Sequence, residues 1–227
     1  MSAALVRKAT AELIGTAFLV AAVVGSGIAA TRLSPGAVGL QLLENSLVTG
    51  AALVALILTL QPVSAAFNPV VTLVEAALGL LAWADAALLA LAQIVGGVIG
   101  VIVANLMFQL DPVTLSTHAR TGANLWLGEI VATFGLILVI FGAVRAGRTQ
   151  TIAYAVGGYI TAAYWFTSST SFANPAVTIA RMFSNTFSGI DPSSVLLFVL
   201  MQVIGAGLGY VAVRFLYPHP HLTEASA

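Results

Sequence analysis

Two asparagines are each followed by proline within apolar surroundings, in the segments FNPVVTL (67–73) and FANPAVTIAR (172–181). Asparagine is a favourable helix cap, and proline suits the first helical position because its missing N–H needs no partner there. Each asparagine amide also carries two N–H donors. If Asn68 and Asn174 meet inside a membrane, a water or polyol oxygen can accept hydrogen bonds from them, whereas a cation meets donors and positive helix ends. The pair therefore indicates a site for neutral solutes.

The composition predicts that the elements positioning this pair lie in a lipid bilayer. Of the 227 residues, 59% are hydrophobic and 7% are charged, which is outside the range of soluble domains. The formal net charge of zero argues against a nucleic-acid partner. The absence of cysteine excludes disulfides and thiolate metal ligands, and we expect neither a metal nor a cofactor.

The apolar runs and the helix-breaking residues between them predict six membrane-spanning helices in a single transmembrane domain, residues 1–227. The spans are expected near 9–30, 45–61, 85–107, 126–145, 151–168 and 193–216. Six spans place both termini on one side, and the side with more Lys and Arg is the cytoplasmic one. Arg7, Lys8, Arg145, Arg148 and Arg214 fall on the side of the termini, and Arg32, Arg120 and Arg181 fall on the other. We therefore expect a plasma (inner) membrane protein with both termini in the cytoplasm.

The chain contains an internal repeat. AELIGT, NPVVT and QIVGGVIG in the first half correspond, in the same order, to GEIVAT, NPAVT and QVIGAGLG in the second. The repeats cover approximately 9–107 and 126–216, with three spans each. An odd number of spans makes the second half enter the membrane from the opposite side, so the repeats are inverted.

Inversion explains why a helix would start within the apolar region. From each Asn-Pro to the next breaker there are about ten residues, which as helix measure roughly 15 Å, or half of a hydrocarbon core about 30 Å thick. The two segments are therefore predicted to be half-helices whose positive N-termini meet at the bilayer midplane. Such backbone needs polar surroundings, so the pair should line a water-filled cavity.

These residues resemble the aquaporin and aquaglyceroporin (major intrinsic protein) family, whose signature is two Asn-Pro-Ala half-helices in an inverted six-span bundle. The resemblance extends from Ala11 to about Tyr217. The second motif, Asn174-Pro175-Ala176, matches the signature, whereas the first reads Asn68-Pro69-Val70 and departs from it in its third residue. The resemblance implies a passive channel for water and small neutral solutes, assembled as a homotetramer with one pore per subunit.

The outer constriction departs further from the family pattern. Most members have Arg directly after the second motif, where this chain has Val177. An ungapped count from the two motifs places the other constriction positions on Val48, Ala162 and Ser171, with Thr161 as the substitute if span five is shifted by one. All are small or apolar. The resemblance is therefore closest to the atypical bacterial aquaglyceroporins linked to arsenic-resistance genes, and it implies a wide constriction that passes glycerol and makes arsenous acid a candidate solute.

Arg181 lies four residues after Val177, hence on nearly the same face of a helix and about one turn further along it. Helical side chains lean back toward the N-terminus, so its guanidinium could enter the outer vestibule. The alternative is an arginine that extends to the lipid headgroups.

Four polar residues fall at matching places in the repeats: Glu12 and Glu129, and Gln93 and Gln202. An ionised carboxylate at the centre of a span costs about 2.5–3.5 kcal/mol, so each needs partners. The carboxylates could form a proton relay, or they could accept hydrogen bonds from the N–H groups of the half-helices and loops. Their symmetric placement, without a neighbouring His or Lys, favours the structural role, and the glutamines are expected to anchor loops as well.

Two classes of function remain. A passive channel is favoured, and the alternative is a proton- or ion-coupled secondary transporter, which can share inverted repeats and broken helices. An enzyme is not expected, because no Ser/His or His/Glu constellation falls within a span.

Overall fold

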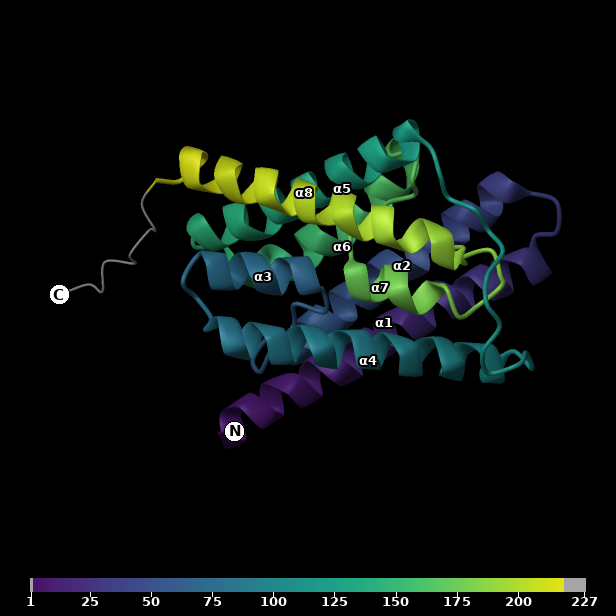
Figure 1. Cartoon of the computed structure of the whole chain (residues 1–227), viewed down its shortest axis with the longest axis horizontal. Helices are drawn as coiled ribbons and strands as arrows, with labels where there is room; N and C mark the ends of the chain where they lie inside the picture. Colours follow the sequence, from purple (N-terminus) through teal and green to yellow (C-terminus); the bar gives the residue numbers. More distant parts are fainter. Residues whose placement is uncertain (1, 219–227) are drawn as a thin grey trace.

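The computed structural model describes residues 2–218, and within these residues the regular structure is entirely helical. The helices are α1 (Ala3–Leu33), α2 (Val38–Leu60), α3 (Pro69–Ala77), α4 (Trp83–Met107), α5 (Ala123–Arg145), the 3₁₀ turn η1 (Thr149–Thr151), α6 (Ile152–Phe166), α7 (Pro175–Arg181) and α8 (Pro192–Leu216). The predicted all-α fold is confirmed, with six long helices and two half-helices, α3 and α7 (Figure 1).

Five of the helices are long and apolar enough to cross a membrane by themselves: α1, α2, α4, α5 and α8. The sixth, α6, has 15 residues and is extended at its start by η1. The predicted span at 45–61 begins earlier than expected, at Val38, because polar residues in its first turns are buried against α1. Asn45 Nδ2 donates to Val23 O and Ser26 Oγ, both at 2.8 Å, and Gln41 Nε2 donates to Ser34 O at 2.8 Å.

The two repeats use the same helix contact. In the first, α1 packs along α4, and in the second α5 packs along α8. A Cβ at Gly96 would collide with the carbonyl of Leu13, and one at Gly205 would lie 2.6 Å from the carbonyl oxygen of Ile130. Both glycines therefore permit the close backbone approach that small residues give to membrane helices.

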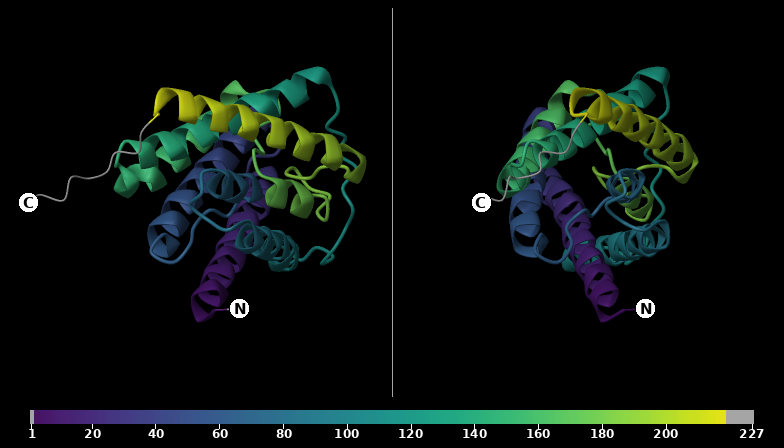
Figure 2. Two further views of the ribbon diagram at one scale, coloured as in Figure 1. Left: turned by 60° about the vertical axis from the view of Figure 1, so that its left-hand side comes forward. Right: turned by 90° about the vertical axis from the view of Figure 1, so that its left-hand side faces the viewer.

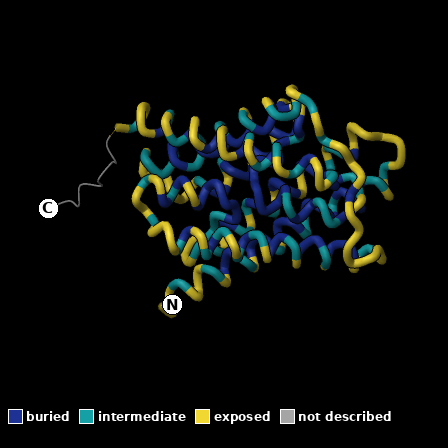
Figure 3. Tube along the Cα trace, viewed as in Figure 1, coloured by how far each residue is buried: buried dark blue, intermediate teal, exposed yellow. Residues whose placement is uncertain are grey.

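The half-helices lie end to end between α4 and α8 (Figures 1 and 2). They begin at Pro69 and Pro175, as predicted, and their N-termini face each other in the middle of the molecule. Contacts of α2 with α6, α4 with α7 and α3 with α8 join the two repeats. Buried residues are concentrated along this middle region, whereas the outward faces of the long helices are exposed and largely apolar (Figure 3).

Candidate functional site

The two asparagines cap the half-helices in matching conformations. Asn68 has φ −153° and ψ 116°, and Asn174 has φ −155° and ψ 112°. Asn68 Oδ1 accepts a hydrogen bond from Val70 N at 3.1 Å, and Asn174 Oδ1 accepts from Ala176 N at 2.9 Å. Because each amide oxygen is held by its own helix, each Nδ2 group is turned toward the other half of the molecule.

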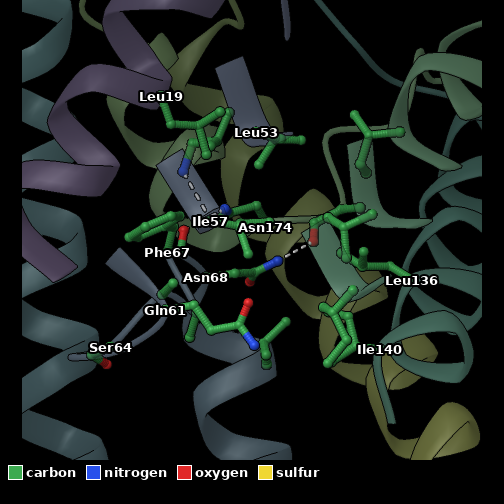
Figure 4. A pocket seen from close by; sticks show the side chains of 18 of the residues that line it. Leu19, Leu53, Ile57, Gln61, Ser64, Phe67, Asn68, Leu136, Ile140 and Asn174 are labelled. Atoms are coloured by element: carbon green, nitrogen blue, oxygen red, sulfur yellow. Dashed lines mark hydrogen bonds between the residues drawn. The ribbon is translucent and has the colours of Figure 1, made fainter. Parts of the chain in front are cut away.

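Each asparagine also donates to the loop of the opposite repeat. Asn68 Nδ2 donates to Ala173 O at 2.8 Å, and Asn174 Nδ2 donates to Phe67 O at 2.7 Å (Figure 4). An amide has two N–H donors, so one remains on each side chain, rather than the two counted from the sequence. Both side chains line the same cavity, where the remaining pair of donors is available to a solute.

The carbonyls that accept these bonds belong to residues with unusual backbone conformations. Phe67 has φ +49° and Ala173 has φ +48°, the left-handed region that residues other than glycine rarely adopt. Such a conformation costs about 1–3 kcal/mol and persists only where the surroundings fix it. Here the N–H of Phe67 donates to Glu12 Oε2 at 2.7 Å, and that of Ala173 donates to Glu129 Oε2 at 2.9 Å.

Glu12 and Glu129 hold both loops in this way. Glu12 also accepts from Ser64 Oγ and Ala66 N, and Glu129 also accepts from Phe172 N. Both side chains are fully buried. Among the described residues, none of the groups bonded to either carboxylate is titratable, so neither is placed for a proton relay.

Gln93 and Gln202 connect these carboxylates to the half-helices. Gln93 Nε2 donates to Glu12 Oε2 at 2.8 Å and to Thr72 Oγ1 at 2.9 Å. Gln202 Nε2 repeats the arrangement with Glu129 Oε2 at 2.6 Å and Thr178 Oγ1 at 2.8 Å. Each glutamine thus fixes the position of one half-helix relative to one loop, as expected for an anchor.

A cavity of about 370 Å³ passes between the two asparagines. We call its two ends the α7 mouth, lined by Tyr164, Phe172 and Arg181, and the α3 mouth, lined by Lys8, Glu75 and Thr149. Much of the wall between them is aliphatic, and Val23 is part of it. Figure 4 labels five further aliphatic residues of this wall: Leu19, Leu53, Ile57, Leu136 and Ile140. An apolar passage with few polar groups suits a solute that must pass without binding strongly.

Of the four residues predicted for the constriction, two line the cavity. Ser171 and Val177 line the cavity and are buried. The predictions of Val48 and Ala162 are wrong, because Val48 is 43% exposed, Ala162 is also exposed, and neither lines the cavity. The substitute, Thr161, does not line it either, since its hydroxyl donates to Gly157 O at 2.8 Å.

The neighbouring positions Thr49 and Tyr164 line the cavity instead, and their hydroxyl groups lie 3.1 Å apart. The ungapped count failed because each residue of offset turns a side chain by about 100° around a helix. The α7 mouth is therefore more aromatic and more polar than the sequence predicted. Two hydroxyl-bearing residues within apolar spans were the signal that could have identified the pair.

Arg181 lies at the α7 mouth and not among the lipid headgroups. It is 3% exposed, its Nε donates to Ser188 O, and its guanidinium carbon lies 3.5 Å from the centre of the Phe172 ring. The Nη groups have no hydrogen-bond partner in the described part of the chain, and the side chain lines the cavity. Of the two interpretations of Arg181, the structure contradicts the one that extends it to the headgroups.

Comparisons with known proteins agree with this architecture. A family model described as "Major intrinsic protein" matches residues 1–152. The chain is 48% identical over 213 residues to the aquaglyceroporin AqpS of Rhizobium meliloti (strain 1021), covering 93% of this chain and 91% of that relative. It is 27% identical over 225 residues to the probable aquaporin TIP2-2 of Oryza sativa subsp. japonica, covering 95% and 89%. The structure of the aquaglyceroporin from Plasmodium falciparum superposes with a TM-score of 0.73 over 94% of this chain and 98% of that one, and at 17% identity this likeness concerns the fold alone.

Proposed function

Because the chain belongs to the major intrinsic protein family, we propose that the cavity between Asn68 and Asn174 is the pore of a passive channel for water and small neutral solutes such as glycerol. The protein is a channel and not an enzyme. The observation that carries the assignment to this cavity is the pair of crossed asparagine bonds, which leaves one donor of each amide for the solute.

A solute oxygen passing this point accepts hydrogen bonds from both amides. A water molecule bound in this way directs its own hydrogens away from the pair, which opposes proton transfer along a file of waters. A cation gains nothing from the donors and meets the positive ends of α3 and α7. Neutral hydroxyl compounds are therefore the solute class, and arsenous acid, which carries hydroxyl groups and is uncharged, is a candidate within it.

The family resemblance and the apolar outer surface support a proposal for the oligomeric state of the protein and for its location in the membrane. The outward faces expose large apolar side chains, among them Phe18, Leu91 and Val211, so we propose a multi-pass protein of the plasma membrane that packs against lipid and against copies of itself in a homotetramer. The distribution of Lys and Arg supports cytoplasmic termini. Residues 1–227 would then form one channel domain, with the α7 mouth outside and the α3 mouth inside.

A stopped-flow experiment on proteoliposomes tests the channel against the coupled-transporter alternative. We expect water and glycerol fluxes that rise linearly with the concentration gradient and ignore membrane potential and proton gradients. A saturable flux that follows either gradient would favour the transporter. Vesicles that conduct water and reject every larger neutral solute would restrict the assignment to a water channel.

A further inference from the structure

Two arginines share one aromatic ring at the α7 mouth. The guanidinium carbon of Arg181 lies 3.5 Å from the centre of the Phe172 ring, and that of Arg120 lies 4.9 Å from the same centre. Arg120 belongs to the long loop between α4 and α5, and Arg181 ends α7. The ring itself lines the cavity. Segments some sixty residues apart thus bring two positive charges to one side of the pore entrance.

Three consecutive backbone carbonyls hold these guanidinium groups in place. Arg120 Nε donates to Gly189 O at 2.9 Å and its Nη2 donates to Phe187 O at 3.4 Å, while Arg181 Nε donates to the carbonyl between them, that of Ser188. Ser188 is fixed in turn, since its hydroxyl donates to Val23 O at 3.0 Å. The two side chains are therefore positioned by the segment between α7 and α8.

The loop that carries Arg120 is itself fixed to the same segment. Thr114 N donates to Phe183 O at 3.1 Å, Ser116 N donates to Met182 O at 2.9 Å, and Asp191 N donates to His118 O at 2.8 Å. The backbone N–H of Arg120 donates to Ser194 Oγ at 3.1 Å. Arg120 is thus held by its backbone as well as by its side chain, and its distance from the cavity is well defined.

Neither guanidinium forms an ion pair in the described part of the chain, although the buried carboxylate of Glu129 lies near enough to interact with both charges. Among residues 2–218, no carboxylate lies within the 4.0 Å of a salt bridge from either guanidinium. Guanidinium groups remain charged at physiological pH, and their field is strong where protein and lipid exclude water. The carbonyls and the ring stabilise the cations without removing their net charge.

We propose that Arg120 acts with Arg181 as a second cation barrier at the α7 mouth, separate from the asparagine pair, and that the two supply the positive charge that Val177 does not. The proposal rests on the proposed channel function and deepens it. Arg181 lines the pore and also offers N–H donors to the solute. Arg120 does not line the cavity and acts through its charge. Neutral solutes are indifferent to this field, whereas an approaching cation is repelled before it reaches Asn174.

Arg120→Gln tests the charge, because glutamine keeps an N–H donor for the loop carbonyls and removes the cation. In planar bilayers we expect sodium and potassium conductance to rise by about an order of magnitude, since a unit charge close to the entrance is removed. Arg120→Lys should still exclude cations, because lysine keeps the positive charge, although it lacks the planar guanidinium group. The glycerol flux of both variants, measured in proteoliposomes, should stay near that of the wild type.

Arg32 provides a matched control. Its Nη2 donates to Phe108 O at 2.7 Å and its guanidinium carbon lies 5.3 Å from the Phe108 ring, yet neither residue lines the cavity. Arg32→Gln should leave cation conductance unchanged. The proposal is overturned if Arg120→Gln conducts no more than Arg32→Gln, or if Arg120→Lys leaks as much as Arg120→Gln, which would assign Arg120 a purely structural role. A wild-type protein without any glycerol or water flux would instead refute the channel function.

Discussion

The hydroxyl group of Thr49 lies 3.1 Å from that of Tyr164, across the interface between α2 and α6. The two residues come from different repeats and both line the cavity close to the α7 mouth. Thr49 Oγ1 also donates to Asn45 O at 2.8 Å, which fixes its rotamer. Phe172 and Val177 line the same cavity as this pair.

The position of the constriction can be tested by adding bulk at adjacent residues of α2. Thr49→Phe should lower glycerol permeability severalfold and water permeability less, because the larger side chain enters the cavity. Val48→Phe is the control, since Val48 faces outward. Tyr164→Ala provides the opposite change and should raise glycerol permeability. Equal effects of the two phenylalanine variants in stopped-flow measurements would show that Thr49 does not face the pore.

A second prediction concerns Val177, which is buried and lines the cavity. Val177→Arg places a long, permanently charged side chain with five donors into the constriction. The ratio of glycerol to water permeability should fall, because the passage narrows and the new charge lies near Arg181. Adding Arg181→Ala to this variant should restore part of the flux. If the ratio of glycerol to water permeability is unchanged in Val177→Arg, Val177 does not belong to the constriction.

The asparagines should control both stability and cation exclusion. In the double variant Asn68→Asp/Asn174→Asp each side chain loses the donor that binds the opposite carbonyl, at a cost of about 1–3 kcal/mol for each group left unpaired. The two carboxylates also attract cations to the midplane. We expect a lower melting temperature in detergent and a measurable cation conductance in bilayers. If the double variant folds and conducts cations no better than the wild type, the positive helix ends are not what excludes cations.

Glu12 is predicted to matter for stability and not for coupling to protons. Glu12→Gln replaces one of the two acceptor oxygens by a donor, so the N–H of either Ala66 or Phe67 loses its acceptor, which should destabilise the fold by about 1–3 kcal/mol for each unpaired group. Glu75→Gln is the control, because the carboxylate of Glu75 lines the α3 mouth and makes no side-chain hydrogen bond within residues 2–218. Thermal unfolding in detergent measures the difference. If Glu12→Gln left the melting temperature unchanged and made the flux independent of pH, the relay would be the better account.

The parts of this molecule that depend on local signals were predictable. Asn-Pro fixes a helix start within a residue or so, which is why Pro69 and Pro175 begin the half-helices as expected. The repeat then determined the arrangement of the spans. The orientation of Thr49 and Tyr164 toward the cavity was not predictable, because it depends on how α2 and α6 are rotated about their axes. Polar contacts between helices, such as that of Asn45 with α1, determine this rotation.

The positions of residues held by contacts with loops could not be predicted from the sequence either. Arg181 could be placed near the pore from its spacing to Val177, but only the carbonyl of Ser188 and the ring of Phe172 decide between the two positions considered for it. Arg120 lies in a loop without periodicity. Its partners are some seventy residues away, so no pattern in its own segment indicates them.

The crossed bonds between Asn68 and Ala173 and between Asn174 and Phe67 also constrain the order in which the protein can mature during synthesis. When the first three spans have entered the bilayer, the amide of Asn68 and the carbonyl of Phe67 still lack their partners, which are encoded about a hundred residues later. The first half-helix therefore cannot reach its final environment until the second loop has been translated and has folded back from the opposite side. The two donors at the midplane are therefore placed together only after residues 173 and 174 have been synthesised.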